Sequence, residues 1–208
     1  MLQTQNVEPG TLEILKKLME LPELSDFLLV GGTALSLHYG HRLSADLDLF
    51  SSTEFDNTFI AQAMEKKFTG FSYRSGNNPI GLFGFIDGVK IDLVKYHYHP
   101  LIYAAVIIDG IRFISIPDIM GMKIAAIMKR GVKKDFWDIA ELLNHYSVED
   151  FINYYTKKYP TQQLLISVPH AMTYFDDAEE SEDPISLKGQ TWESVKKNIQ
   201  QKVSDYLR

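Results

Sequence analysis

Two aspartates, Asp46 and Asp48, stand two positions apart in the segment ADLDLF (residues 45–50). The alternation predicts a strand, and residues two apart on a strand share a face, so the two carboxylates should lie about 7 Å apart on one side. Like charges at this spacing repel, whereas Mg²⁺ commonly binds one or two carboxylates together with substrate phosphates. A solvated strand at a sheet edge would also carry such a pair, so the pair alone leaves both interpretations open.

A third carboxylate, Asp92, lies in VKIDLVKY (residues 89–96). Ile91 and Leu93 form the apolar face of this predicted strand and leave Asp92 on the opposite face. Aspartate is unfavourable in strands, so its presence here suggests a role. Two metal ions about 4 Å apart stabilise the attacking and leaving oxygens of a phosphoryl displacement. Convergence of three aspartates would suit such a site, and the candidate metal ligands are Asp46, Asp48 and Asp92.

A glycine turn, Gly31-Gly32-Thr33, joins a predicted strand at 26–30 to a predicted helix that ends at Gly40. Free backbone N–H groups and the positive end of the helix dipole attract phosphate at such a position. The Thr33 hydroxyl could add a donor, although a tight turn with Thr33 as a helix cap explains the same residues. The chain contains neither GxGxxG nor GxxxxGK[ST], which leaves dinucleotide-binding and P-loop interpretations without support.

Hydrophobic periodicity divides the chain at about residue 116. The first half mixes strands and helices, and the second half is almost entirely helical, which predicts an α+β fold: a mixed sheet with flanking helices in a domain at 1–116, then a helical domain at 117–208. The polar, acidic stretch at 176–190 is predicted to be a surface loop, and Thr11 is placed to cap the first helix. Further helices are predicted at 11–21, 57–68, 118–130, 134–146, 148–159 and 192–207, and strands at 71–75, 80–88, 89–96 and 104–116, with Asp-Gly hairpin turns between strands.

Composition and charge exclude several classes of protein. The 208 residues are 45% hydrophobic and contain no cysteine, so neither a disulfide framework nor a thiolate metal site is expected. No apolar run approaches the roughly 18 residues that cross a bilayer, and the N-terminus lacks the pattern of a secretion signal. We therefore expect a cytoplasmic protein with no membrane association. A net charge of −6 argues against a protein that is basic all over, and DNA is not an expected partner.

Lys123 lies in the middle of an apolar stripe on the predicted helix 118–130. At roughly 100° per residue, it projects between Ile119 and Ile127, and Arg130 continues the same line. A charge within an apolar face is costly unless it is paired or bound to a ligand. Lys123 and Arg130 are therefore candidates for contacts beyond simple solvation.

Asp135 occupies an equivalent place on the predicted helix 134–146, with Asp138 at the edge of its apolar stripe. One interpretation is a buried ion pair that joins the two helices, either Lys123–Asp135 or Arg130–Asp138. The other is a contact between Lys123 and a phosphate of the substrate. We favour the phosphate contact for Lys123 because it faces the half with the aspartates.

Several other charged residues have less specific patterns. Lys129, Lys133 and Lys134 could form a rim for a nucleic-acid acceptor, although solvated charge at a helix end is the commoner explanation. His38 and His41 are close enough to the glycine turn to reach a substrate, but we expect ordinary surface histidines.

Together these motifs resemble the nucleotidyltransferase (polymerase β-like) superfamily, which has a glycine turn, a helix, a DxD strand and a later Asp strand. The closer resemblance is to the AbiEii/AbiGii toxin type, the nucleotidyltransferase half of type IV toxin–antitoxin systems. It rests on GGTALSLHYGHRLSADLDLF (31–50), KIDLV (90–94) and IPDIMGMKIAAIMKRGVKKDFWDIAELL (116–143). Thr33 stands where the superfamily often has serine.

The resemblance implies a role for each motif residue. Asp46 and Asp48 would bind Mg²⁺, and Asp92 would be the third ligand or the base that takes a proton from the acceptor hydroxyl. Lys123 would contact nucleotide phosphates, and Asp135 would be the late polar residue of the catalytic site. The remaining nucleotide-binding residues implied by the family pattern are Gly31, Gly32, Thr33, Arg42, Ser44 and Arg130.

The implied reaction transfers an NMP from an NTP to an acceptor hydroxyl and releases pyrophosphate, with a two-ion Mg²⁺ site. The implied acceptor is a tRNA 3′ end, with growth arrest as the outcome and a separately encoded antitoxin protein as partner. Two alternatives stay open: transfer to a small-molecule or protein hydroxyl, and a non-catalytic nucleotide-binding module. A basic groove beside the cleft would favour RNA, and a closed aromatic pocket would favour a small acceptor.

Overall fold

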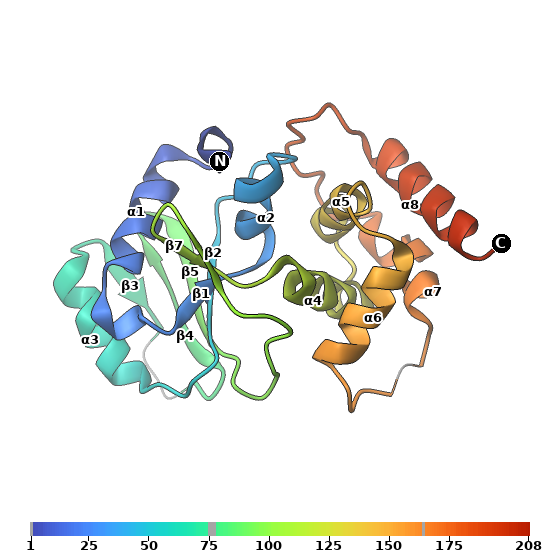
Figure 1. Ribbon diagram of the computed structural model, residues 1–208. Helices are drawn as coiled ribbons and strands as arrows, with labels where there is room; N and C mark the ends of the chain where they lie inside the picture. Colours follow the sequence, from blue (N-terminus) through green and yellow to red (C-terminus); the bar gives the residue numbers. More distant parts are fainter. Residues whose placement is uncertain (1, 75–77, 164) are drawn as a thin grey trace.

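A computed structural model describes residues 2–74, 78–163 and 165–208 (Figure 1). Within these residues a seven-stranded mixed sheet has the strand order β3-β4-β5-β2-β1-β7-β6. The strands are β1 (Phe27–Leu29), β2 (Leu47–Ser51), β3 (Phe71–Tyr73), β4 (Gly81–Ile86), β5 (Val89–Lys95), β6 (Val106–Ile108) and β7 (Ile111–Phe113). The helices are α1 (Pro9–Met19), α2 (Gly31–Tyr39), α3 (Asn57–Lys67), α4 (Ile116–Lys129), α5 (Lys133–Leu142), α6 (Val148–Lys158), α7 (Val168–Thr173) and α8 (Trp192–Tyr206).

The two halves of the molecule differ in the way that periodicity predicts. In Figure 1 the sheet lies with α1 and α3 on one side of the molecule, the helices α4 to α8 lie on the other, and α2 lies between them. From Ile116 onward the described elements are helices. The predicted α+β fold class is confirmed. No helix within the described residues is long and apolar enough to cross a membrane.

The strands at the centre of the sheet alternate between a core face and a polar face. Leu47 and Leu49 of β2 are buried, as are Ile91 and Leu93 of β5. Their intervening residues project from the other face of the sheet. Because β2 and β5 pair in parallel, with Leu47 opposite Ile91 and Leu49 opposite Leu93, the apolar residues align on one side. The predicted alternation of both strands is confirmed.

Both predicted Asp-Gly turns close hairpins. Asp87 and Gly88 join β4 to β5 with φ values of 49° and 86°, and Asp109 and Gly110 join β6 to β7 with 50° and 78°. Positive φ at both central residues matches the right-handed twist of the flanking strands and favours Asp-Gly. The β4–β5 hairpin matters for the site because it fixes the register of Asp92.

The structure departs from the local predictions in two places. The first helix begins at Pro9 after Glu8, so Thr11 is a buried residue inside α1 and not its cap. The short helix α7 was not predicted, because six residues do not reveal a helical period. The predicted surface loop at 176–190 is mostly exposed, as expected, and its later part also pairs with the chain at 41–43, where Leu43 donates to Ile185 O and Leu187 donates to His41 O.

A buried ion pair anchors α6 to the start of α4. Lys158 and Asp118 are fully buried, and Lys158 Nζ lies 2.6 Å from Asp118 Oδ1. The same carboxylate accepts the backbone N–H of Ile102, and Lys158 also donates to Pro100 O. This cluster therefore holds the loop after β5 against two helices.

Replacing Lys158 by methionine should destabilise the fold, because Asp118 would keep a buried charge without its ammonium partner. We expect the free energy of unfolding to fall by about 3 kcal/mol, measured by urea denaturation. Lys157→Met, an exposed neighbour on α6, is the matched control and should change the value by less than about 0.5 kcal/mol. Equal effects of the two substitutions would contradict a structural role for the pair.

Candidate active site

The N-terminus of α2 faces a strand carboxylate. Gly31 has a φ of +70°, and a Cβ at this position would lie 2.9 Å from Asp48 Oδ2. Val30 N donates to Asp48 O at 3.0 Å, which holds the turn against β2. Glycine is therefore required both for the backbone conformation and for the close approach of Asp48. Free N–H groups at the start of α2 are placed to meet an anion beside this carboxylate.

Thr33 has a supporting position. Its side chain is buried, its hydroxyl donates to Asp46 O, and its Oγ1 lies 2.9 Å from Ser44 Oγ. These contacts fix the segment that leads into β2. Thr33 does not line the cavity described below, whereas Gly31, Gly32 and Ser44 do.

Asp48 and Asp92 are neighbours on adjacent strands. The parallel register of β2 and β5 places them directly opposite each other, on the face away from Leu47 and Leu93. Burial raises the pKa of the Asp48 carboxyl, and the nearby Asp92 charge raises it further. The two carboxylates therefore form a pair that is unfavourable without a cation.

Lysines contact the outer carboxylate oxygens. Lys90 Nζ donates to Asp92 Oδ2, while Asp92 Oδ1 is buried without a hydrogen-bond partner among the described residues. Asp46 lies just before β2, is half-exposed, and has Lys134 Nζ 3.8 Å from its Oδ2. The unpartnered oxygen of Asp92 is the atom in this group that most needs a ligand.

The donor set suits a hard divalent cation. Carboxylate oxygens are the ligands that Mg²⁺ prefers, and an unpartnered Asp92 oxygen beside a destabilised Asp48 carboxylate would gain from one. In the described part of the chain, however, no three His, Cys, Asp or Glu side chains converge into a complete metal site. The ammonium groups of Lys90 and Lys134 lie near two of the three carboxylates instead.

A cavity of about 390 Å³ opens in front of these groups. One part of its wall is aromatic: the Phe50 and Tyr96 rings lie 5.0 Å apart, and Tyr96 Oη lies 2.9 Å from Tyr159 Oη. The basic residues of the wall are Arg42, Lys123, Lys129, Arg130 and Lys134, and the acidic ones are Asp46, Asp48 and Asp92. An apolar, aromatic surface next to cations and carboxylates can hold a planar base and a polyphosphate together.

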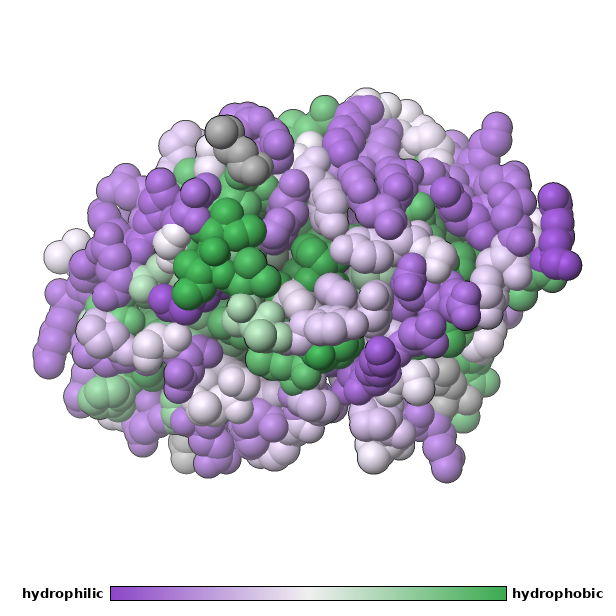
Figure 2. Space-filling model, viewed as in Figure 1, coloured by the Kyte–Doolittle hydropathy of each residue, from purple (hydrophilic) through white to green (hydrophobic). Residues whose placement is uncertain are grey.

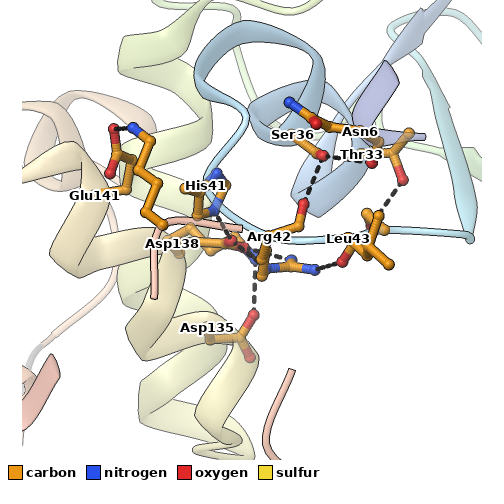
Figure 3. Close-up of polar contacts among 12 residues, drawn as sticks. Asn6, Thr33, Ser36, His41, Arg42, Leu43, Asp135, Asp138 and Glu141 are labelled. Carbon is orange, nitrogen blue, oxygen red and sulfur yellow. Dashed lines mark hydrogen bonds and ion pairs between the residues drawn. The ribbon is translucent and has the colours of Figure 1, made fainter. Parts of the chain in front are cut away.

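A buried ionic cluster lies behind the cavity (Figure 3). Asp138 Oδ1 accepts from Arg42 Nε at 2.7 Å and lies 2.7 Å from His41 Nε2; Arg42 Nη2 donates to Oδ2 at 2.9 Å. Lys123 Nζ lies 2.6 Å from Asp138 Oδ2 and 2.8 Å from Asp135 Oδ1. Burial alone would raise the pKa of Asp138, but Arg42 and Lys123 hold it well below its usual value. We call these residues, His41, Arg42, Lys123, Asp135 and Asp138, the Asp138 cluster.

The Asp138 cluster tests the two ion pairs predicted for the helical charges, and the phosphate contact of Lys123 stays a prediction. The Lys123–Asp135 pair is confirmed, but the alternative Arg130–Asp138 pair is wrong. Arg130 Nε lies 3.2 Å from Asp135 Oδ2 instead, with 58% of its side chain exposed. Asp135 does not line the cavity, so its place is behind Lys123.

For the segment 41–42, the prediction for His41 is wrong, and the nucleotide-binding role of Arg42 stays a prediction. His41 is fully buried and not a surface histidine. Arg42 is also buried, and its guanidinium fork is directed to Asp138, although the residue does line the cavity. Its partner lies 96 positions later in the chain. No local pattern could reveal this pairing, because bidentate Arg–carboxylate contacts depend on tertiary structure.

Sequence reasoning also missed residues of the cavity wall. No functional role was predicted for Phe50, Tyr96 and Tyr159, or for Lys90, which lines a neighbouring groove and shares a strand face with Asp92. The two-residue spacing of Lys90 and Asp92 was a usable signal for a shared face. The Tyr96–Tyr159 contact was not predictable, since it joins the two halves of the chain.

A family model described as nucleotidyl transferase AbiEii toxin, type IV TA system, matches residues 13–205. The chain belongs to this family. The resemblance predicted from the motifs and the nucleotidyltransferase enzyme class are thereby confirmed. The AbiEii-family chain is also 35% identical over 202 residues to the uncharacterized protein aq_aa25 of Aquifex aeolicus (strain VF5), covering 94% of this chain and 95% of the relative.

Solved structures show the same fold. A putative nucleotidyltransferase from H. pylori matches with a TM-score of 0.58 at 17% identity, covering 97% of this chain and 99% of that one. MenT4, a nucleotidyltransferase toxin from Mycobacterium tuberculosis H37Rv, matches with a TM-score of 0.56 at 12% identity, covering 93% of this chain and 82% of that one. The predicted nucleotidyltransferase fold is confirmed by these neighbours.

Replacing Asp138 by asparagine should destabilise the protein strongly, because Arg42 and Lys123 would lose their shared counter-charge in a buried site. We expect a loss of about 3–5 kcal/mol in the free energy of unfolding at pH 7, measured by urea denaturation. The pKa of Asp138 is lowered in the folded protein, so its stabilisation is fully present above the unfolded value of 3.8 and is lost as pH falls through the folded pKa. The difference between wild type and Asp138→Asn should therefore shrink in acid. Asp205→Asn on the exposed face of α8 is the control, and a loss of similar size there would refute the assignment.

Replacing Asp48 by asparagine should have the opposite effect on stability. The substitution removes a buried charge whose pKa is raised by burial and by Asp92, so the metal-free protein should gain about 1 kcal/mol at pH 7. Thermal unfolding in the presence of EDTA measures this gain. A decrease in stability would show that Asp48 contributes to the fold and is not strained at a functional site.

Proposed function

We propose that the chain is a Mg²⁺-dependent nucleotidyltransferase that transfers an NMP from an NTP to the 3′ hydroxyl of a tRNA. The observation that carries this proposal is the Asp48–Asp92 pair, set opposite each other on β2 and β5 and facing the N-terminus of α2. Carboxylates for a cation and N–H groups for phosphate are the two requirements of nucleotidyl transfer, and the family supplies the reaction class.

The phosphates of the NTP would bind at the start of α2. Backbone N–H groups at Gly31 and Gly32 donate to phosphate oxygens, assisted by the positive end of the helix. Lys123 and Arg130 line the same cavity and add positive charge. Because Asp135 and Asp138 hold Lys123 in place, its ammonium is positioned before substrate binds, which reduces the reorganisation that transition-state stabilisation requires. The aromatic wall formed by Phe50, Tyr96 and Tyr159 would receive the base.

In the transfer step, the acceptor oxygen attacks the α-phosphorus in line with the leaving group. An O–Pα bond forms, the bond between Pα and the bridging oxygen of pyrophosphate breaks, and pyrophosphate leaves with that electron pair. Asp92 Oδ1, which has no partner among the described residues, would take the proton of the acceptor hydroxyl.

Mg²⁺ would be held by Asp46, Asp48 and Asp92, and when bound it would neutralise charge on the phosphates. Lys134 and Lys90 lie against the outer oxygens of Asp46 and Asp92. Both side chains are half-exposed and can turn toward solvent when the carboxylates take another cation.

We propose further that residues 1–116 form the catalytic domain and residues 117–208 a helical domain that closes the cleft. The cavity wall supports this division, because Asp48 and Tyr96 come from the first part and Lys123 and Tyr159 from the second. The proposal places the enzyme in the cytoplasm, where NTP and tRNA are both present. The type IV description of the family supports a separately encoded antitoxin as partner.

Incubation with Mg²⁺, each α-³²P-labelled NTP in turn and total tRNA tests the proposal. Label should move to tRNA with wild type, and Asp48→Asn should reduce the rate by about 10²–10³-fold, because an electrostatic stabiliser of the transferring group is lost. EDTA should abolish transfer, and Asp205→Asn should behave as wild type.

Other outcomes would favour the alternatives. Labelling of a small molecule or a protein, with no label on tRNA, would show that the acceptor is not tRNA. The proposed nucleotidyl transfer reaction would still hold. Mg²⁺-dependent NTP binding with no transfer to any acceptor would indicate a non-catalytic nucleotide-binding module.

A further inference from the structure

An open face of the sheet continues outward from the catalytic carboxylates. Asp92 of β5 lies opposite Phe83 of β4, and Arg74, which follows β3, donates its N–H to Phe83 O. The order across the sheet is therefore Asp48, Asp92, Phe83, Arg74. This row leads away from the candidate active site along the direction of strand pairing.

A second row runs parallel to the first. Lys90 of β5 lies opposite Phe85 of β4, which lies opposite Ser72 of β3. Because side chains alternate along a strand, Lys90 and Phe85 share a face with Asp92 and Phe83. Aromatic and basic residues thus alternate on one surface, which we call the acceptor face and define as Ser72, Arg74, Phe83, Phe85 and Lys90.

The acceptor face is exposed although it is aromatic. Phe85 is 49% exposed and Phe83 is partly exposed, whereas Leu82 and Ile86, which flank them on β4, are buried in the core. A groove of about 860 Å³ runs over this face and shares Asp92 with the catalytic cavity. Phe83 and Phe85 therefore do not belong to the core. The groove ends at Asp92, the candidate general base.

Charge and shape favour one type of occupant. Single-stranded nucleic acids bind to proteins through aromatic side chains that stack on bases and cations that follow the backbone. Arg74 and Lys90 supply positive charge on a chain whose net charge is −6. Asp92 and Arg74 are separated by two inter-strand spacings of the sheet, about 10 Å. This distance accommodates only the terminal nucleotides of a single-stranded nucleic acid.

We propose that the acceptor face binds the single-stranded 3′ end of the RNA acceptor, with Phe83 and Phe85 stacking on its terminal bases and Arg74 and Lys90 contacting its phosphates. This inference rests on the proposed function, because it takes the acceptor to be RNA. It adds the place and the chemistry of acceptor recognition: stacking selects an unpaired end, and the terminal hydroxyl reaches Asp92.

Binding without turnover tests the inference separately from the proposed function. A fluorescein-labelled single-stranded RNA of about ten nucleotides is titrated with the full chain, and fluorescence anisotropy gives the Kd. Phe85→Ser and Arg74→Gln should each weaken binding about tenfold, because one stacked base or one phosphate contact is lost. The matched control is Ile107→Ser on β6 at the opposite edge of the same sheet, where the side chain is 68% exposed. The same RNA in a fully paired duplex should bind more weakly than the single strand.

Steady-state transfer to tRNA separates acceptor recognition from catalysis. Phe85→Ser should raise KM for tRNA about tenfold and leave KM for NTP unchanged, and Ile107→Ser should leave both unchanged. Equal single-strand affinity in wild type, Phe85→Ser and Arg74→Gln would overturn the inference, as would the absence of single-strand binding by wild type. In either case, transfer of label to tRNA by wild type would still support the proposed function. If wild type instead binds RNA in a Phe85-dependent way and transfers no label, that result would overturn the proposed transfer reaction and support RNA binding by the acceptor face.

Discussion

The carboxylate of Asp138 is the interaction on which the candidate site depends. It accepts the guanidinium fork of Arg42 and contacts both His41 and Lys123, which come from the segment after α2 and from α4. One buried negative charge therefore connects the sheet-bearing part of the chain to two helices of the second part (Figure 3). Because buried charges need partners, movement of any of these elements would leave a cation or the carboxylate unpaired. The cleft is thus held together by charges in its back wall.

At the front of the cleft the charges destabilise the fold, in contrast to the paired charges of the back wall. Asp48 and Asp92 face each other with few compensating cations, and one oxygen of Asp92 has no hydrogen-bond partner within the described residues. A fold selected for stability alone would not place two acids in register there. Functional sites commonly keep such unfavourable arrangements while the rest of the structure supplies the stability. Within the described residues, the Asp138 cluster, in which both carboxylate oxygens of Asp138 meet cations, and the Lys158–Asp118 pair concentrate buried ionic contacts.

The strand order produces two adjoining surfaces from one set of side chains. Parallel pairing of β2 with β5 brings the carboxylates together, and antiparallel pairing of β5 with β4 and β3 extends the same face toward Phe83, Phe85 and Arg74. The buried apolar residues of β2, β4 and β5 point to the other face, where they form the core: Leu47, Leu49, Leu82, Ile86, Ile91 and Leu93. In Figure 2 hydrophobic residues gather in a green patch left of the centre and in smaller patches between purple hydrophilic ones. Exposed aromatic residues beside Asp92 therefore call for a functional explanation more than isolated ones elsewhere do.

Local patterns in the sequence determined most of the elements, the glycine turn and the shared face of the aspartates, because periods of 2 and 3.6 residues and Asp-Gly turns act over a few positions. They also placed Lys123 and Asp135 inside apolar stripes and so identified them as unusual charges. They did not determine which partners these charges meet. Arg42 with Asp138 and Tyr96 with Tyr159 are pairs of residues far apart in the chain, and His41 is buried by the same distant helix that carries Asp138. Only the packing of the helical half against the sheet-bearing half brings these residues within hydrogen-bond distance. Periodicity reports which face is buried, whereas the identity of the opposing face is a property of the tertiary structure alone.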